Sequence, residues 1–200
     1  FTILVLAGAG QRASIPSSPI ALTPPGSPSP AASATPELAA TVSDLHLLAT
    51  STSGRWRLVG MLQNDSGFPA RSIVIKASLI DGLGRAHGTQ DIVAAESSLE
   101  PGERTPFEAF FTEAPAGSRA SVHVSGYLPA EARGAAAELS GLEAAPTGDG
   151  GLAVFGLVRA AGSSPVEVRD LVIALRASPG GDLIGVALRT AGVTRLEPGQ

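Results

Sequence analysis

Few residues in this 200-residue chain have the types and spacing that chemistry requires. Gly82 to Gly88 reads Gly-Leu-Gly-Arg-Ala-His-Gly and is superficially similar to a dinucleotide-binding loop. In such a loop the third glycine comes three positions after the second and opens a helix. Here it comes one position late, and no helical pattern follows. The favoured interpretation is the turn of a β-hairpin.

The other candidate groups are equally weak. His46, His87 and His123 lie in separate expected elements without the short spacings of zinc ligands. No Gly-x-Ser-x-Gly elbow and no acid–base pair is suggested. Asn64-Asp65-Ser66 matches a glycosylation sequon but is more simply a turn. We therefore expect no catalytic residue, no cofactor-binding residue, no metal ligand and no cofactor, and we expect a protein that is not an enzyme.

Composition narrows the class of protein. The chain has 24 Gly, 16 Pro and only 16% charged residues, which is typical of turn-rich all-β domains. Its net charge is −4 and its basic residues are scattered, so nucleic acid is not an expected partner. The absence of Cys excludes thiol catalysis, thiolate metal sites and disulfides, so each folded unit must be held by its core.

The first 13 residues begin with an apolar run, FTILVLAGAG. Ala7-Gly8-Ala9 fits the small-x-small cleavage pattern of a secretory signal, and ten residues are too few to span a bilayer, which needs about 20. We interpret residues 1–13 as the remnant of a signal peptide or of a membrane anchor. The alternative is a buried strand from another domain, which the following segment would leave without partners.

Residues 14–36 alternate Pro with Ser, Ala and Thr. Proline removes backbone donors and fixes φ, so this segment is predicted to be a disordered, extended linker that acts as a stalk. Its Pro-Pro-Gly-Ser-Pro run could instead bind a proline-recognition groove, but it lacks a flanking basic anchor.

After the linker, apolar residues alternate with polar ones in short runs. One face is formed by every second residue from Trp56 to Leu62, another by those from Ile73 to Leu79, and a third by those from Ala120 to Gly126. A period of two is typical of half-buried strands. Turn-forming residues separate the runs at Asn64, Asp81 and Glu100. The pattern predicts an antiparallel β-sandwich in which Trp56, Leu58, Ile75, Leu79, Phe107 and Val122 are buried.

The second half of the chain repeats the first. Gly60 and Pro69 recur 96 positions later, as Gly156 and Pro165. After one inserted residue the offset becomes 97, so the sequence Leu-Glu-Pro-Gly at 99–102 recurs at 196–199. The first copy continues through two expected closing strands, at 107–111 and 120–127, whose counterparts do not follow in the second. We therefore expect the second copy to be incomplete and less stable.

The series GMLQNDSGFP, IKASLIDGLGRAHGT and LEPGERTPFEAFF resembles the bacterial FxLYD domain family, whose name describes a strand ending in Asp before a Gly turn. Leu79 and Asp81 match that motif, whereas Ala77 and Ile80 stand at its aromatic positions. The resemblance covers about residues 44–127 and, more weakly, 139–200, where Leu175 alone is kept. It implies an immunoglobulin-like, exported or membrane-tethered module with no catalytic residues.

The expected organisation is all-β, with two tandem immunoglobulin-like sandwiches after a disordered Pro-rich segment. The first covers residues 41–128, a connector with helix-forming composition covers 129–138, and the second covers 139–200. We expect an extracytoplasmic, non-catalytic structural or interaction module that binds an unidentified protein or cell-envelope partner and meets a membrane only through its N-terminal segment. The alternative is a pair of accessory domains of a larger exported enzyme that acts on the cell envelope.

Overall fold

The computed structural model describes residues 2–9, 37–50, 54–96, 98–133, 136–148, 151–178 and 181–198. These residues form twelve strands and no helix, and every strand pairing among them is antiparallel. The predicted all-β class is therefore confirmed. The linker predicted over 14–36 lies outside the described residues.

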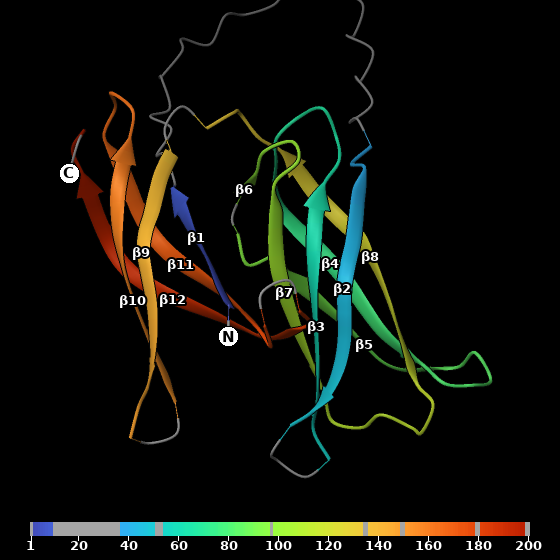
Figure 1. Ribbon diagram of the computed structural model, residues 1–200. Helices are drawn as coiled ribbons and strands as arrows, with labels where there is room; N and C mark the ends of the chain where they lie inside the picture. Colours follow the sequence, from blue (N-terminus) through green and yellow to red (C-terminus); the bar gives the residue numbers. More distant parts are fainter. Residues whose placement is uncertain are drawn as a thin grey trace, which may run out of the picture.

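Two sheets make up what we call the first unit, residues 37–133 (Figure 1). One sheet has the order β2-β3-β7, and in the other β4 pairs with β8 along one side and with β5 and the short β6 along the other. The bounds are β2 Ala40–Ala49, β3 Trp56–Asn64, β4 Ala70–Ile80, β5 Ala86–Val93, β6 Ser98–Leu99, β7 Arg104–Phe111 and β8 Arg119–Pro129.

The core of the first unit lies between these two sheets. Ile73, Ile75, Ala77 and Leu79 face inward from β4, as predicted, and Phe107, Ala109 and Phe111 meet them from β7. Phe107 is the largest fully buried side chain. The prediction that Trp56 and Val122 are buried is wrong, because both are only half-buried at the margin of the core. The two predicted closing strands are confirmed as β7 and β8.

Strands β9 to β12, with β1, form the second unit (Figure 1). Its two sheets have the orders β10-β9 and β1-β11-β12. The bounds are β1 Thr2–Ala9, β9 Ala136–Pro146, β10 Leu152–Ala161, β11 Val166–Arg176 and β12 Leu183–Leu196. A smaller apolar cluster, which includes Val158, Ala160, Val166 and Val168, lies between the two sheets.

A shared bulge relates the two units in detail. The register of β2 against β3 shifts between Ser43 and His46, and Asp44 there has a φ of 51°. The register of β9 against β10 shifts across the corresponding residues, and Gly141, 97 positions after Asp44, has a φ of 60°. The left-handed region suits Gly and is tolerated by Asp. The sequence repeat therefore extends to an irregular feature of the backbone.

Strand β1 occupies in the second unit the place that β8 occupies in the first. Leu79 of β4 pairs with Ala120 of β8, and Leu175, 96 positions after Leu79, pairs with Ile3 of β1. β1 also lies beside β9, as β8 lies beside β2. The expectation that a strand at residues 2–9 has no partner is wrong, and so is the expectation that the β8 position of the second unit is empty. The partner strand comes from the other end of the chain, so a comparison in chain order does not find it.

The connector also differs from its expectation. Alanine and glutamate favour a helix between Pro129 and Ala145, but residues 130–133 form no helical turn and β9 begins at Ala136. Helix propensity is a weak preference, and pairing of this segment with β10 overrides it. Strand β9 therefore includes the last residues of the segment that the sequence analysis assigns to the connector.

Candidate functional site: polar clusters and sheet faces

The hairpin between β4 and β5 uses the polar side chains of the dinucleotide-like run for its own turn. Oδ1 of Asp81 accepts hydrogen bonds from the backbone N–H of Leu83 at 2.8 Å and of Arg85 at 2.9 Å. Its Oδ2 lies 2.7 Å from Nε2 of His87. The hydrogen bond from Arg85, followed by the contact with His87, holds the pKa of Asp81 below its usual range. Gly84, with a φ of 80°, allows the turn, so the predicted hairpin is confirmed.

The three histidines do not come together. His46 lies on β2 with Nε2 3.7 Å from Oδ1 of Asp182, His87 belongs to the turn at Asp81, and His123 points outward from β8. In the part of the chain that the structure describes, no three His, Asp or Glu residues are arranged to hold a metal ion.

The sequon at Asn64 is part of the fold. Asn64 is buried, and its side-chain nitrogen donates to the carbonyls of Phe68 and Leu99, each at 3.0 Å. Its side-chain oxygen accepts from the backbone N–H of Ser66. This amide closes the loop after β3, which agrees with the predicted turn and leaves the nitrogen no free access to an enzyme.

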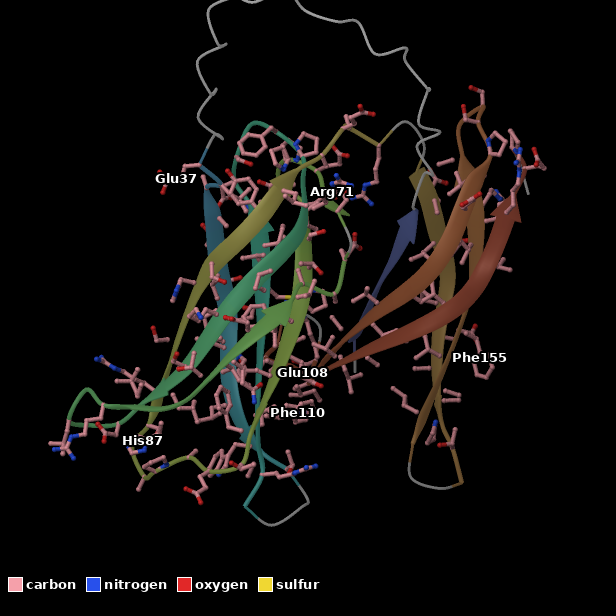
Figure 2. All side chains as sticks on the ribbon, turned by 180° about the vertical axis from the view of Figure 1, so that it is seen from behind. Glu37, Arg71, His87, Glu108, Phe110 and Phe155 are labelled. Atoms are coloured by element: carbon pink, nitrogen blue, oxygen red, sulfur yellow. The ribbon has the colours of Figure 1, made fainter. Side chains whose placement is uncertain are left out.

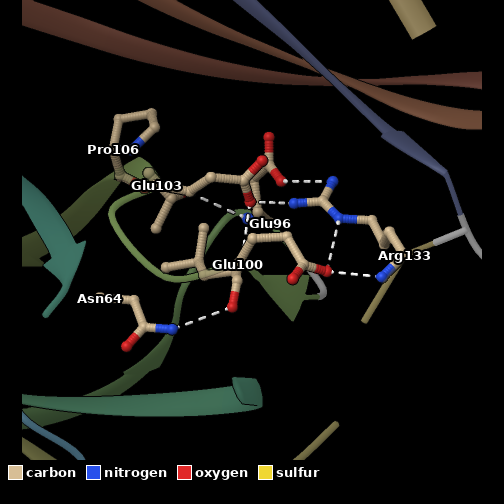
Figure 3. A network of polar contacts seen from close by, with 8 residues as sticks. Asn64, Glu96, Glu100, Glu103, Pro106 and Arg133 are labelled. Carbon is tan, nitrogen blue, oxygen red and sulfur yellow. Dashed lines mark hydrogen bonds and ion pairs between the residues drawn. The ribbon is translucent and has the colours of Figure 1, made fainter. Parts of the chain in front are cut away.

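A cluster of three carboxylates surrounds Arg133 where the chain leaves the first unit (Figure 3). The guanidinium donates to Glu103 Oε2, and its Nη1 and Nε lie 3.7 Å from Glu96 Oε2 and Glu100 Oε1. The backbone N–H of Arg133 also donates to Glu100 Oε1 at 2.6 Å. These contacts attach the start of the connector to the turn at Pro101-Gly102.

Glu96 is the most deeply buried carboxylate of this cluster, with 5% of its side chain exposed. Burial raises the pKa of Glu96 to about 7, and the nearby Arg133 opposes this shift only in part. A raised pKa can mark a general acid, but a catalytic reading also needs space for a substrate. One hollow on the first unit lies elsewhere, between Glu37, Leu38 and residues 124–127 of β8. The Arg133 cluster is therefore best explained as a structural joint.

The two units contact each other face to face. Val59 and Met61 point outward from β3 and are fully covered by Ala174 of β11 and Leu183 of β12, with Leu48 and Val186 at the margin. The sequence predicted that β3 is buried on one face only. The structure corrects this: all five residues from Leu58 to Leu62 are buried, because the second unit covers the outer face.

Polar groups surround this apolar contact. Nη2 of Arg57 donates to the carbonyl of Ile184 at 2.7 Å, and Nη1 lies 3.6 Å from Glu108 Oε2. Burial raises the pKa of Glu108, against the opposing effects of Arg57 and of the Val186 backbone N–H. Asp44 accepts a hydrogen bond from Arg176 at 2.6 Å, and this contact lowers the pKa of Asp44. The bulge at Asp44 thus directs a carboxylate toward the second unit.

The equivalent outer face of the second unit is not covered. Phe155 and Leu157 of β10 stand 96 positions after Val59 and Met61, and they are 60% and 67% exposed. Figure 2 shows Phe155 on the side of the second unit that faces away from the first. Leu142 and Leu152 belong to the opposite face of the β9–β10 sheet, the face of Gly156 and Val158. Exposed large apolar side chains such as Phe155 and Leu157, side by side on one sheet face, are typical of interaction sites.

From the sequence we predicted no chemical site. We did not predict that the outer face of β3 is covered by the second unit or that the equivalent face of β10 is apolar and exposed. The signal was present in the unbroken apolar run at Leu58–Leu62 and in Phe155, where strict alternation would place a polar residue. Continuous apolar runs indicate burial on both sides of a strand.

Comparison with models of known protein families, with curated proteins and with solved structures found no match to this chain. Among the described residues, no helix is long and apolar enough to cross a membrane.

Proposed function

We propose that this protein is a non-catalytic interaction and spacer module, exported from a bacterial cell or anchored at its surface, with units of the immunoglobulin-like FxLYD type. The observation that carries this proposal is the contrast between two equivalent faces. Val59 and Met61 are a buried docking face for a neighbouring unit, whereas Phe155 and Leu157 expose the same type of face. A protein that keeps large apolar side chains in water at this position has a partner for them.

The polar clusters support the same proposal. Asp81 stabilises a hairpin turn, Asn64 closes a loop, and Arg133 attaches the connector. Asp44 and Arg57 reinforce the contact between the units. Each cluster has a structural role, as expected for a scaffold that displays surfaces rather than a site that converts a substrate.

The export part of the proposal rests on the Pro-rich linker and on the resemblance to the FxLYD family, because the apolar run at residues 2–9 is strand β1 of the second unit. It is tested by placing a single cysteine at the exposed Ser121, since the chain has no other cysteine. Cells that express the full-length gene with Ser121→Cys are treated with a maleimide that does not cross membranes. We expect labelling of intact cells. Labelling only after the cytoplasmic membrane is broken would contradict export.

A further inference from the structure

The contact between the two units joins one hairpin to one sheet face. The hairpin connects β11 to β12, and its Ala174 and Leu183 pack on Val59 and Met61 of the outer β3 face. Polar contacts beside this packing are Arg176 with Asp44 at 2.6 Å, Asp182 with His46 at 3.7 Å, and the carbonyl of Ile184 with Arg57 at 2.7 Å. Because the chain is a repeat, the hairpin has a counterpart in the first unit and the face has a counterpart in the second.

The hairpin between β4 and β5 is the counterpart of the β11–β12 hairpin. Across its turn, the N–H of Asp81 donates to the carbonyl of Arg85 at 2.9 Å. In the hairpin of the second unit, the N–H of Ala177 donates in the same way to the carbonyl of Asp182 at 3.0 Å. The strand pairings beside both turns also correspond, with offsets of 96 positions in the first strand and 97 in the second. Arg85 therefore stands in the place of Asp182.

The outer face of the β9–β10 sheet is the counterpart of the β3 face. Val59 pairs with His46 of β2. Phe155, 96 positions after Val59, pairs with Glu143 of β9, which stands 97 positions after His46. Glu143 therefore stands in the place of His46, on the face that carries the exposed Phe155 and Leu157.

The charges at these places are exchanged between the two surfaces. In the contact between the units, the hairpin brings the acidic Asp182 and the face brings the basic His46. In the counterparts, the hairpin brings the basic Arg85 and the face brings the acidic Glu143, and both side chains are exposed. The counterpart hairpin and face thus keep opposite charges at the same place, with both signs reversed.

A second pair of residues changes together. Asp44 of the face bonds Arg176 of the hairpin, whereas Gly141 and Ile80 stand at the two counterpart places. A charge kept on one surface alone would lose its partner in a contact, which is costly when the charge is buried. Neither counterpart carries a charge, so a contact between them leaves no charge unpaired at this place.

The sizes of the apolar side chains also compensate. On the face, Phe155 stands in the place of the smaller Val59. On the hairpin, Ala86 stands in the place of the larger Leu183. Apolar contacts tolerate such exchanges when the total volume is kept. The counterpart hairpin therefore has room for the larger ring of the counterpart face.

We infer that the β4–β5 hairpin of one copy of this chain docks on the outer β9–β10 face of a second copy, as the β11–β12 hairpin docks on β3 within one chain. Arg85 of one copy then lies beside Glu143 of the other, and Ala86 packs on Phe155. The two surfaces consist of residues 78–89 in one copy and of residues 140–145 and 153–157 in the other. The inference rests on the proposed function and names the partner of the exposed face.

In this mode the copies join head to tail. Figure 2 shows His87, at the start of β5, and Phe155 on opposite sides of the molecule. The hairpin of one copy therefore reaches the face of another copy rather than its own. A contact between two different surfaces extends into a chain of copies unless it closes into a ring.

The other hairpin of a second copy does not fit this face. Asp182 would face Glu143, which places two negative charges together. Leu183 would meet Phe155, so two large side chains would occupy the space of one large and one small. Like charges and overlapping side chains exclude a wrong partner. Between these two hairpins, the face therefore selects the one at β4–β5.

Charge reversal tests the contact in the purified 200-residue chain. Sedimentation velocity over a concentration series should show concentration-dependent association of the parent chain. Arg85→Glu and Glu143→Arg should each weaken this association at least about tenfold, because like charges then face each other. An equimolar mixture of the two variants, and a chain that carries both changes, should associate as the parent does. Such rescue excludes a folding defect as the cause of the loss.

Two further variants locate the contact. Arg71→Glu changes the net charge by the same amount as Arg85→Glu, at an exposed position near the other end of β4, and should leave association unchanged. Phe155→Ser removes the apolar contact and should weaken association at least about tenfold.

Three outcomes would overturn the inference. The first is a parent chain that stays monomeric up to about 1 mM. The second is association that Phe155→Ser weakens and Arg85→Glu does not, which would mean that two β9–β10 faces contact each other. The third is a mixture that associates no more than the single variants, which would show that Arg85 and Glu143 do not meet. These experiments use purified protein, so their failure is distinguishable from failure of the maleimide test of export.

Discussion

Glu96 places a carboxyl group in a buried position beside a single arginine that already contacts two other carboxylates. Arg133 brings one positive charge, and Glu96, Glu100 and Glu103 bring up to three negative ones. Since burial disfavours the charged form, the most buried member keeps its proton to a higher pH than a free glutamate does. The cluster therefore makes the stability of the first unit depend on pH near neutrality.

The sign of this dependence follows from the two pKa values. Glu96 ionises near 4.5 in the unfolded chain and near 7 in the folded one. Between these values the unfolded state holds fewer protons, so the free energy of unfolding falls as pH rises from about 4.5 to about 7 and then levels off. Glu96→Gln removes this term. At about pH 8 the variant should be more stable than the parent by about 1 to 3 kcal/mol, and at about pH 4.5 the two should be nearly equal.

Urea unfolding at the two pH values measures this difference. Glu103→Gln is the matched control, because Glu103 contacts the same arginine but is 43% exposed. It should change the free energy of unfolding by less than about 1 kcal/mol at either pH. A Glu96→Gln variant that is less stable than the parent at pH 8 would show that the attraction to Arg133 outweighs the cost of burial.

Among the elements, β1 and β11 form the pairing that the order of the chain does not suggest. Their register places Val5 opposite Ile173 and Ala7 opposite Leu171. Opposite residues of antiparallel strands have Cβ atoms about 4.5 to 5.5 Å apart, whereas diagonal pairs are about 7 to 8 Å apart. The Cβ atoms of a disulfide lie about 3.5 to 4.5 Å apart, a distance that the directly opposite pair can reach with a small shift and the diagonal pair cannot.

Paired cysteines in the Cys-free chain test this register. Val5→Cys with Ile173→Cys should form an intramolecular disulfide quickly under mild oxidation, as measured by peptide mass spectrometry. Val5→Cys with Leu171→Cys, displaced by two positions, should oxidise much more slowly. Equal rates for the two pairs would contradict the pairing of β1 with β11.

Much of this strand arrangement can be predicted from the sequence, for local reasons. Alternation identifies the inward face of β4 at Ile73 to Leu79, and Pro101-Gly102 identifies the turn before β7, where Gly102 has a φ of 81°. The repeat places β9 to β12. The partner of β1 could not be predicted, because it depends on a contact between distant segments that leaves no local pattern. The apolar run at Leu58–Leu62 indicates burial of Met61, but it does not indicate which residues cover it. The helix-forming composition before Ala145 misleads because strand pairing overrides it.

Across the whole molecule, the sheets follow one another in a fixed order. The β4 sheet packs on the β2-β3-β7 sheet, which contacts the β1-β11-β12 sheet, and this sheet packs on β9-β10. Figure 1 shows the hairpin end of β11 and β12 reaching the first unit beside β3 and β7. The covered face at Met61 lies at the middle of this series, and the exposed face at Leu157 lies at its end.

This order predicts different effects for equivalent substitutions. Met61→Ala removes a buried side chain from the contact between units and should lower the free energy of unfolding by about 2 to 5 kcal/mol. Leu157→Ala, at the equivalent exposed position, should change it by no more than about 1 kcal/mol. Chemical denaturation of both variants measures this, and equal losses would mean that the two faces are covered to the same extent.

The account depends most directly on the claim that the two units are held as one body, so that their surfaces are displayed in a fixed relation. Spin labels on Ser121→Cys in β8 and Arg159→Cys in β10 mark two exposed positions, one in each unit. Double electron–electron resonance between them should give one narrow distance distribution in the parent chain, and Met61→Ala should broaden it. Units joined only by a flexible connector would sample a wide range of separations. A broad distribution in the parent chain, unchanged by Met61→Ala, would contradict the account.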